Sequence, residues 1–284
     1  MVIAVASGKG GTGKTTVSAA LALALSAEGP VSFLDCDVEE PNAGIFLSAE
    51  KPDEQPVEVS VPAVDAEKCT GCGACASFCR FNALAMVRGK VLVFPELCHG
   101  CGGCTLVCPS QAITERGERI GVIRRGMVGS ISFADGCLDV GRAMSPPLIR
   151  ALKKGIRRSG LTIIDSPPGT SCPMVTAVKG ADYVLLVTEP TPFGLHDLKL
   201  AVLTMRETEI PFGVIINRSD AGDDRVVRWC DEQNIRILMQ IPEDRRVAEA
   251  YSRGKTILDA DGSYRERFTV LLRFLESASY GGGQ

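Results

Sequence analysis

Two runs of cysteine carry the most specific chemistry in this sequence of 284 residues. The first run is "CTGCGACASFCRFNAL" from Cys69, and the second is "CHGCGGCTLVCPSQAI" from Cys98. Each cysteine of the first run reappears 29 residues later in the second, which indicates duplication of a small unit. Three thiolates at steps of three residues can wrap one face of an iron–sulfur cubane. Zinc also accepts thiolates, but its sites usually pair two separated C-x-x-C elements, so the spacing favours iron–sulfur clusters.

The motif C-x-x-C-x-x-C-x-x-x-C, followed by Pro109 in the second run, resembles the bacterial two-cluster ferredoxins over about residues 61–116. In that family the fourth cysteine of each run ligates the other cluster. Arg80 departs from the family pattern, because a proline usually follows the first run as well, and this leaves the polarity around one cluster open. The resemblance implies two [4Fe–4S] clusters per chain, one held by Cys69, Cys72, Cys75 and Cys108 and the other by Cys98, Cys101, Cys104 and Cys79.

A second constellation is the glycine-rich stretch "VASGKGGTGKTT", residues 5–16. Its spacing satisfies G-x-x-x-x-G-K-[ST], the phosphate-binding loop, between a strand-like run and a helical segment. In such a loop, backbone N–H groups surround phosphate oxygens, the lysine reaches the β and γ phosphates, and the hydroxyl after it binds Mg²⁺. The sequence therefore predicts an ATP site that contains Gly8, Gly10, Gly11, Thr12, Gly13, Lys14, Thr15 and Thr16.

Carboxylates follow two further apolar runs. Asp165 ends "LTIID", where the carboxylate of a Walker B motif would approach the magnesium shell. Asp35 and Asp37 belong to "DCDVEEPN", which closes the run "VSFLD". Because the carboxyl ends of parallel strands meet at one sheet edge, these groups are expected beside the phosphate loop.

The stretch "SGKGG" resembles the MinD/Mrp-type ATPases with a deviant Walker A motif, a family that includes the nitrogenase iron protein. The resemblance covers nearly all of the chain outside the cysteine insert. It implies that Lys9, which the loop itself does not need, reaches across an ATP-bound homodimer to the partner's phosphates; a merely solvated lysine is the other interpretation. It also implies the remaining roles: phosphate binding for Lys14, orientation of the attacking water for Asp37, magnesium waters for Asp35 and Asp165, γ-phosphate sensing for Gly169, and adenine contacts for Asn217 and Pro242. A strand-end turn is the alternative for Asn217.

Apolar strand-like runs on both sides of the cysteine insert indicate the scaffold that must position these residues. They cover 2–6, 31–35, 161–165, 183–189, 212–217 and 235–241, and a helix is expected at about 15–27. Continuous apolar strands predict a doubly wound, mostly parallel α/β sheet of the P-loop type. We expect an ATPase domain at 1–60 and 117–284, an inserted α+β ferredoxin-like domain at 61–116, linkers at 50–62 and 115–119, and a flexible tail at 279–284.

Four of the twelve cysteines lie outside the two runs. Cys36 and Cys230 are predicted to be small buried apolar residues. Cys137 and Cys172 stand at the same offsets from Asp165 as the two cysteines that hold the subunit-bridging cluster of the nitrogenase iron protein. The resemblance thus implies a third [4Fe–4S] cluster on a dimer axis; two isolated thiols at the sheet edge are the other interpretation.

Composition narrows the functional classes. A net charge of −3 gives no global reason to expect nucleic acid or an anionic membrane as a partner, and no apolar run reaches the roughly 18 residues that span a bilayer. We therefore expect a cytoplasmic, slowly hydrolysing ATPase that a partner stimulates. Electron transfer to a metalloenzyme or a metal cofactor under assembly is one hypothesis, and delivery of metal–sulfur clusters to apo-proteins is the alternative. A positioning ATPase of the DNA-partition or division-site type is disfavoured by the acidic balance.

Overall fold

The computed structural model describes residues 1–50, 53–156 and 160–280. The chain divides into two compact units, which we call the sheet unit and the cysteine unit. The sheet unit comprises Met1–Glu54, Ile123–Cys137 and Ile149–Gln284, and the cysteine unit comprises Gln55–Val122 and Leu138–Leu148. The insert expected at 61–116 lies within the cysteine unit, which also takes in a second segment that the sequence did not suggest.

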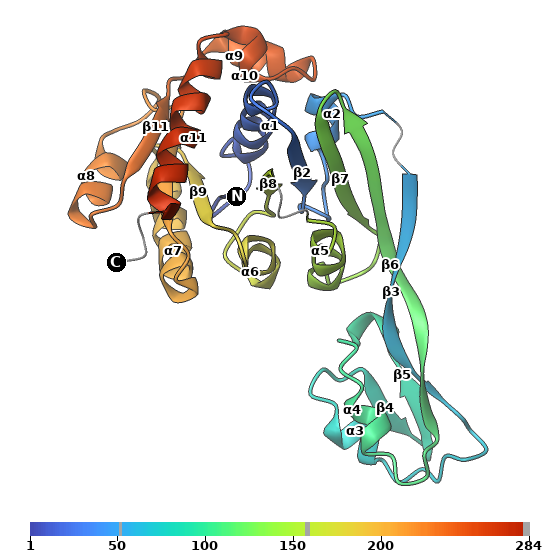
Figure 1. The fold of residues 1–284 in the computed structure, drawn as a ribbon. Helices are drawn as coiled ribbons and strands as arrows, with labels where there is room; N and C mark the ends of the chain where they lie inside the picture. The colour runs from blue at the N-terminus through green and yellow to red at the C-terminus, as the bar shows by residue number, and fades with distance from the viewer. Residues whose placement is uncertain (51–52, 157–159, 281–284) are drawn as a thin grey trace. The chain divides into compact units, whose positions relative to one another are not determined.

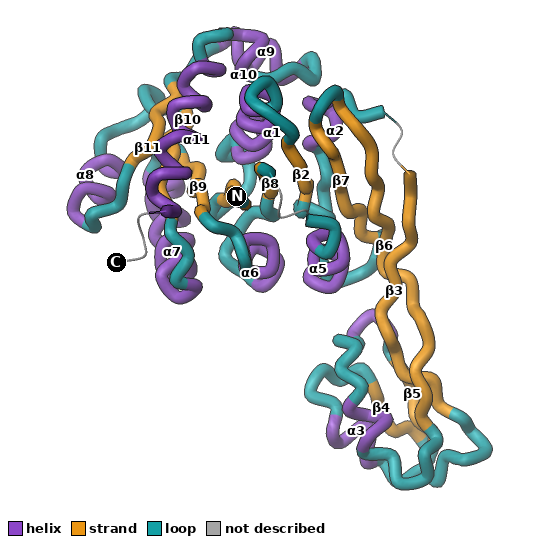
Figure 2. Tube along the Cα trace, in the orientation of Figure 1, coloured by secondary structure: helices purple, strands orange, loops and turns teal. Residues whose placement is uncertain are grey.

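Nine strands of the described residues form one sheet in the order β11-β10-β9-β1-β8-β2-β7-β6-β3 (Figures 1 and 2). The pairs from β11 through β7 are parallel, so the predicted doubly wound, mostly parallel α/β sheet is confirmed. The strands are β1 Val2–Ala6, β2 Val31–Asp35, β3 Asp53–Val64, β6 Ile113–Val128, β7 Ile131–Leu138, β8 Leu161–Asp165, β9 Tyr183–Thr188, β10 Phe212–Asn217 and β11 Ile237–Ile241.

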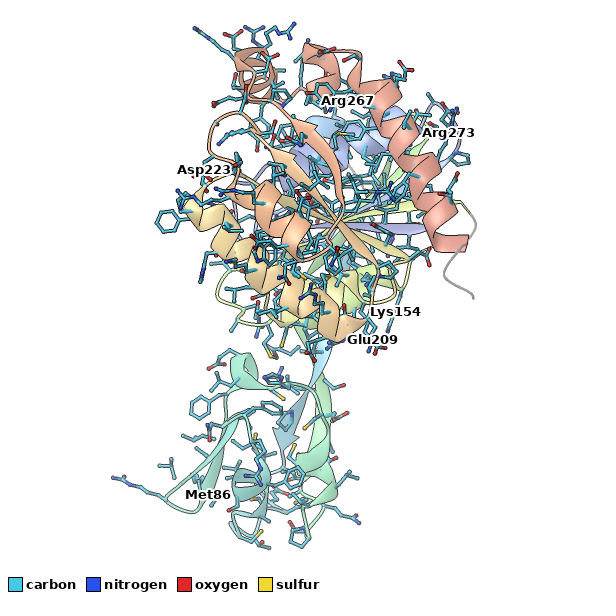
Figure 3. All side chains as sticks on the ribbon, turned by 90° about the vertical axis from the view of Figure 1, so that its left-hand side faces the viewer. Met86, Lys154, Glu209, Asp223, Arg267 and Arg273 are labelled. Carbon is cyan, nitrogen blue, oxygen red and sulfur yellow. The ribbon has the colours of Figure 1, made fainter. Side chains whose placement is uncertain are left out.

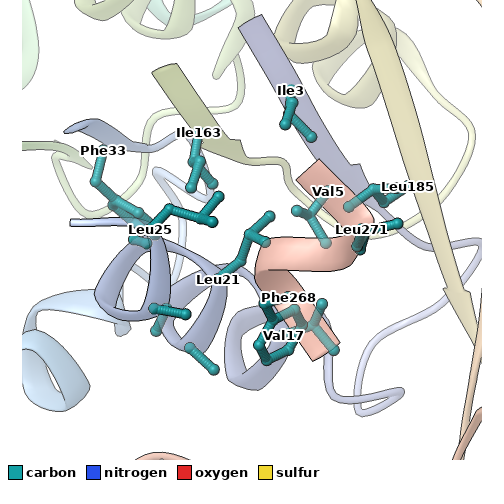
Figure 4. Close-up of a cluster of buried hydrophobic side chains, with 14 of the residues drawn as sticks. Ile3, Val5, Val17, Leu21, Leu25, Phe33, Ile163, Leu185, Phe268 and Leu271 are labelled. Carbon is teal, nitrogen blue, oxygen red and sulfur yellow. The ribbon is translucent and has the colours of Figure 1, made fainter. Parts of the chain in front are cut away.

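Helices cover both faces of the sheet in the sheet unit (Figure 1). On one face, α1 (Lys14–Leu25) lies between the strands and α11 (Tyr264–Tyr280), so its residues are buried almost all around. Figure 4 shows this core, which includes Leu21, Ile163 and Phe268. Arg267, labelled in Figure 3, donates to the Gln240 carbonyl of β11 at 2.7 Å. The other elements of the unit are α2 Ala43–Leu47, α6 Cys172–Val178, α7 Pro192–Thr208, α8 Arg225–Glu232, α9 Arg245–Ser252 and α10 Ile257–Ala260. The helix α5, Pro146–Lys153, begins in the second segment of the cysteine unit and continues into the sheet unit.

The cysteine unit contains short elements between the long strands β3 and β6. An antiparallel hairpin, β4 (Leu84–Val87) with β5 (Lys90–Val93), lies between the two cysteine runs. The small elements are α3 Ala74–Phe78, the 3₁₀ helix η1 Pro95–Leu97 and α4 Gly103–Leu106. At the base of this segment, the Asp65 N–H donates to the Ala112 carbonyl at 2.8 Å, so the chain enters and leaves at hydrogen-bonded neighbours.

Three expectations about irregular segments are corrected. The segments 50–62 and 115–119, expected as linkers, lie largely in β3 and β6, although residues 51–52 fall outside the described residues. Prolines in β3 were misleading, because this strand is at the edge of the sheet, where proline is tolerated. The tail expected at 279–284 begins inside α11, which ends at Tyr280, and residues 281–284 lie outside the described part. Within the described residues, no helix combines the length and apolar character needed to cross a bilayer.

Candidate functional site

The glycine-rich loop joins the end of β1 to the start of α1 at the carboxyl edge of the sheet. Gly11 and Gly13 have φ of 79° and 89°, a left-handed conformation that glycine adopts without steric strain. A Cβ at Gly13 would collide with the side chain of Asn217. The Asn217 side-chain amide donates to the Thr12 carbonyl at 2.9 Å, so the end of β10 is hydrogen-bonded to the loop.

Lys14 is buried at the start of α1 among acidic groups. Its Nζ lies 3.0 Å from Asp165 Oδ1 and 3.8 Å from Asp37 Oδ2. Burial alone would lower the pKa of Lys14, but the charges of Asp165 and Asp37 together raise it above its usual value. The lysine is therefore a fixed cation at the point where the loop motif places nucleotide phosphates.

Asp35 and Asp165 are fully buried and face each other in register on the paired strands β2 and β8. Asp35 is held by the backbone N–H groups of Asp37, Asn42 and Ala43 at 3.1, 3.0 and 2.9 Å. Burial, then the charge of Asp165, raise the pKa of Asp35 well above its usual range. The geometry packs two acidic groups side by side next to one lysine.

One side-chain oxygen of Asp165 bears on whether Mg²⁺ fits this site. Asp165 Oδ2 is buried and has no hydrogen-bond partner among the described residues. Buried polar atoms of this kind are rare and usually mark a missing water, ion or ligand. Thr15, the second residue of α1, is nearly buried at the same sheet edge. The hydroxyl and carboxylate oxygens match the ligands that Mg²⁺ prefers.

A cavity of about 690 Å³ surrounds the loop and is large enough for a nucleotide. It brings together these predicted residues: Gly10, Gly11, Gly13, Lys14, Thr15, Thr16, Asp37, Asn217 and Pro242. The other predicted residues of the nucleotide site are not among those that line it: Gly8, Lys9, Thr12, Asp35, Asp165 and Gly169. Gly169 still lies against the loop, because its N–H donates to the Ser7 carbonyl at 3.0 Å. A Cβ at Gly8 would collide with the Asp197 carbonyl of α7, so that glycine allows the loop to approach a helix.

Sequence reasoning missed several residues that line the same cavity, including Asn42, Arg218 and Tyr251. Asn42 belongs to the stretch "DCDVEEPN", but an amide there gave no metal-binding signal. Tyr251 lies on α9 and packs against Phe46 of α2 with the rings tilted by 32° and their centroids 4.5 Å apart. Nothing in the local sequence of either ring indicates this contact, since the two are joined only by the fold.

Lys9 is paired within its own chain. Its Nζ lies 3.9 Å from Glu189 Oε2, and the other carboxylate oxygen of Glu189 accepts from Arg218 Nη1 at 3.0 Å. The Glu189 side chain is 11% exposed and that of Lys9 34%. The largely buried carboxylate of Glu189 thus pairs with two cations, Lys9 and Arg218. An ion pair this long and partly solvated is weak enough to exchange for another anion.

Asp37 gives a pH-dependent prediction. Burial, partly offset by Lys14, raises its pKa to about 6. Between about pH 4 and 6 the folded chain therefore binds more protons than the unfolded chain, and this group's contribution to stability falls as pH rises through that window. Asp37→Asn removes the effect. In nucleotide-free protein, urea unfolding should show the variant gaining on wild type by on the order of 1 kcal/mol between pH 5 and 7.5, after allowance for solvent screening. An equal difference at both pH values would contradict this assignment.

The two cysteine runs have matching backbones. Each places its short helix, α3 or α4, after two left-handed glycines: Gly71 and Gly73 have φ of 69° and 76°, and Gly100 and Gly102 have φ of 64° and 70°. A Cβ at Gly73 would lie 3.4 Å from Met86 Cγ, a residue labelled in Figure 3. The repeat in the sequence is therefore a repeat in the conformation that presents the thiols.

A cavity of about 370 Å³ in the cysteine unit is lined by all four cysteines of one predicted set. Phe81 and His99 also line it, with stacked rings 3.7 Å apart. The Gly100 N–H donates to Cys98 Sγ at 3.4 Å. Four thiols around a largely apolar cavity match in number and type the donors that an iron–sulfur cluster requires. The four are Cys79, Cys98, Cys101 and Cys104.

The other set shows a similar association. Cys75 is buried, and its pKa is raised mainly by burial and further by the neighbouring thiols of Cys108 and Cys69. The Cys108 thiol has a lowered pKa, because it interacts with the Ser110 hydroxyl at 3.6 Å and accepts from the Ala112 N–H at 3.3 Å. These neighbours agree with the cross-run assignment, in which Cys108 joins the first run.

No three His, Cys, Asp or Glu side chains in the described part of the chain converge closely enough to hold a single metal ion. A cubane instead spreads four thiolates around a core of iron and sulfide, so the relevant grouping is around a cavity. Of the cysteines outside the runs, Cys36 and Cys230 are buried as predicted. Cys137 lies near the end of β7, and Cys172 is exposed at the start of α6.

The sheet order, the glycine loop and the acidic strand ends together define a P-loop nucleotide-binding protein. The chain belongs to the CobQ/CobB/MinD/ParA nucleotide binding domain family, whose model matches residues 3–257. The prediction that the chain is an ATPase is confirmed by this membership.

Individual relatives differ in what their names state. An uncharacterized protein of Methanocaldococcus jannaschii is 31% identical over 91% of each chain. A protein of Pyrococcus abyssi named "Iron-sulfur cluster carrier protein" is 26% identical over 90% of this chain and 78% of its own length. The cell division ATPase MinD of Pyrococcus furiosus has the same fold, with a TM-score of 0.62 at 20% identity over 98% of both chains.

Proposed function

We propose that this protein is an iron–sulfur ATPase in which ATP binding closes a homodimer and thereby controls electron transfer through [4Fe–4S] clusters toward a metalloenzyme or a metal cofactor under assembly. The observation that carries the proposal is the cavity lined by Cys79, Cys98, Cys101 and Cys104, in a chain that also contains a P-loop nucleotide site. A thiol set of this size would ligate a complete cluster within one chain. A resident cluster of this kind would carry electrons.

The nucleotide site supplies the proposed switch. Lys14 would bind the phosphates, Thr15, Asp35 and Asp165 would hold Mg²⁺ and its waters, and Asp37 would orient the attacking water. Bound Mg²⁺ would neutralise charge that develops on the transferred phosphoryl group. Gly169, beside the loop, would respond to the γ-phosphate, and Asn217 and Pro242 would contact adenine. ATP can drive closure only if it binds the closed dimer better than the open chain.

Lys9 is the residue that would make closure depend on ATP. In the free chain it is held by Glu189, and this weak pair would exchange for the phosphates of the partner's nucleotide. Transfer of a cation to a phosphoryl group in trans stabilises both the dimer and the transition state. Hydrolysis and dimerisation would therefore both depend on Lys9.

A second candidate function is cluster delivery, in which the ATPase carries metal–sulfur clusters to apo-proteins. Relatives from Pyrococcus abyssi and Aquifex aeolicus named "Iron-sulfur cluster carrier protein" favour it. Ligation of two clusters by all eight cysteines of the runs favours electron transfer, because a carrier must release its cargo. In either case we expect a redox or cluster-accepting protein as partner in the cytoplasm, and neither nucleic acid nor a membrane.

Electron paramagnetic resonance separates these functions. Protein purified anaerobically and reduced should give [4Fe–4S] spectra that change when Mg·ATP is added. Identical spectra with and without ATP would contradict nucleotide control of the clusters. Rapid loss of iron from the two sets to an apo-ferredoxin acceptor, faster with ATP, would instead support delivery.

Lys9→Ala tests the switch itself. We expect the variant to bind Mg·ATP nearly as wild type does, while ATP-dependent dimerisation is lost and turnover falls on the order of a hundredfold. Nucleotide titration, light scattering and phosphate release measure the three quantities. Lys255→Ala, which removes an exposed lysine of the same unit, is the control. A Lys9→Ala chain that dimerises with ATP and hydrolyses it at the wild-type rate would rule out the role of Lys9 in trans.

A further inference from the structure

Asn42 carries a buried acceptor for which the described chain has no donor. It precedes α2, and its backbone N–H is fixed by Asp35 Oδ2 at 3.0 Å. Asparagine at such a position usually caps the helix, but the Asn42 side chain makes no capping bond. Its Oδ1 is buried and has no hydrogen-bond partner among the described residues. Leaving a buried amide oxygen unpaired is unfavourable, so the site needs a donor from elsewhere.

The surroundings restrict which donor this is. Asn42 lines the 690 Å³ cavity together with Thr16, Asp37 and Glu40. Carboxylates and phosphate oxygens are acceptors, so neither the acidic neighbours nor the phosphates of ATP can satisfy Oδ1. The O–H donors that Mg·ATP brings are the waters on the metal and the ribose hydroxyls. Both are hydroxylic, and both satisfy a carbonyl oxygen in the same way.

We propose that Asn42 is a ligand-positioning residue of the nucleotide site, whose side-chain oxygen accepts a hydrogen bond from an O–H group of bound Mg·ATP. The inference rests on Mg·ATP occupying the 690 Å³ cavity. Because the Asn42 backbone also binds Asp35, one residue connects the buried acidic pair to the ligand. Its side chain contributes to ligand affinity and makes no hydrogen bond that stabilises the free fold.

Three chains test this inference: wild type, Asn42→Ala and Asn42→Asp. Asn42→Ala should weaken Mg·ATP binding about tenfold, since one hydrogen bond in a buried site is lost. Asn42→Asp keeps an acceptor of the same size but adds a negative charge beside Asp37, Glu40 and the phosphates, so it should bind Mg·ATP more weakly than wild type. The urea midpoint of free Asn42→Ala should be no lower than that of wild type, because the side chain has no hydrogen-bond partner to lose and an unpaired buried oxygen is removed.

Two further binding measurements show which O–H group of Mg·ATP is the donor. If a ribose hydroxyl donates, 2′-deoxy-ATP or 3′-deoxy-ATP should bind wild type and Asn42→Ala equally well. If a water on Mg²⁺ donates, the deoxy nucleotides should retain the tenfold difference, and Asn42→Ala should need more Mg²⁺ for half-saturation. Either result supports the inference.

Thr162→Val is a matched control. Thr162 Oγ1 is another buried oxygen without a partner among the described residues, but it does not line the cavity, so its removal should leave nucleotide affinity unchanged. Wild-type affinity in Asn42→Ala would overturn the inference. Wild-type affinity in a Lys14 variant would instead reject the cavity as the nucleotide site.

Discussion

Replacing Lys14 with methionine is expected to weaken Mg·ATP binding at least about a hundredfold, or about 3 kcal/mol. Two effects add. The phosphates lose their buried cation, and they also meet Asp165 and Asp37 without the charge that now lies 3.0 and 3.8 Å from those groups. A fluorescent ATP analogue in a competition titration measures the loss.

Lys14→Met also removes the cation that pairs with Asp165 and Asp37, so weak ATP binding by this variant could result from unfolding. Breaking one half of a buried ion pair destabilises a protein by about 3–5 kcal/mol. The double variant Lys14→Met with Asp165→Asn removes the uncompensated charge and should recover most of the unfolding free energy. It should still bind ATP poorly. A folded double variant with wild-type affinity would show that the loop lysine does not contact nucleotide.

The second large effect concerns the cysteines. Anaerobically reconstituted wild type should contain about eight irons per chain in two clusters, and Cys98→Ala should reduce this to about four. The reason is that a four-thiolate set cannot complete its ligation with three thiols. Iron and labile sulfide analysis gives the count. Cys230→Ala, which removes a buried thiol outside the runs, should leave it unchanged.

Double variants distinguish ligation across the runs from ligation within them. Cys79→Ala with Cys98→Ala should leave about four irons, because both residues belong to one set in the cross-run assignment. Cys98→Ala with Cys108→Ala should leave almost none. The reverse pattern would assign each run to its own cluster. A count near ten that falls to eight on Cys137→Ser with Cys172→Ser would support a bridging third cluster, and an unchanged count of eight would exclude it.

Much of the sheet could be predicted because its strands are local features. Val2–Ala6, Val31–Asp35, Leu161–Asp165 and Phe212–Asn217 have the predicted bounds, since each is a continuous apolar run that ends at a turn. The strand β7 was missed. Its sequence "ISFADGCL" contains serine, aspartate and glycine, and the bulky part of it is buried only because β2 lies alongside. Such a strand is defined by its neighbour more than by its own residues.

In the nucleotide site, too, some residues could be predicted from local sequence and others could not. Lys14 was predicted from the loop motif and Asp37 from the family resemblance, and the structure brings them within 3.8 Å of each other. Glu189, which pairs with Lys9, follows a strand far along the chain and belongs to no motif. Asn42 was not predicted either, because only the folded structure shows that its side-chain oxygen is buried without a hydrogen-bond partner among the described residues. Contacts of this kind depend on tertiary structure and carry no local signal.

The hydrogen bond from Asp65 to Ala112 bears on how such a protein could arise. Because entry and exit of the intervening segment are adjacent, a short hairpin turn could close the gap between β3 and β6 if the segment were excised. Loop-closure entropy grows only slowly with loop length, so exchanging a turn for a folded segment would disturb the flanking strands little. Gain or loss of this segment by a nucleotide-binding ancestor could therefore occur as a single genetic insertion or deletion.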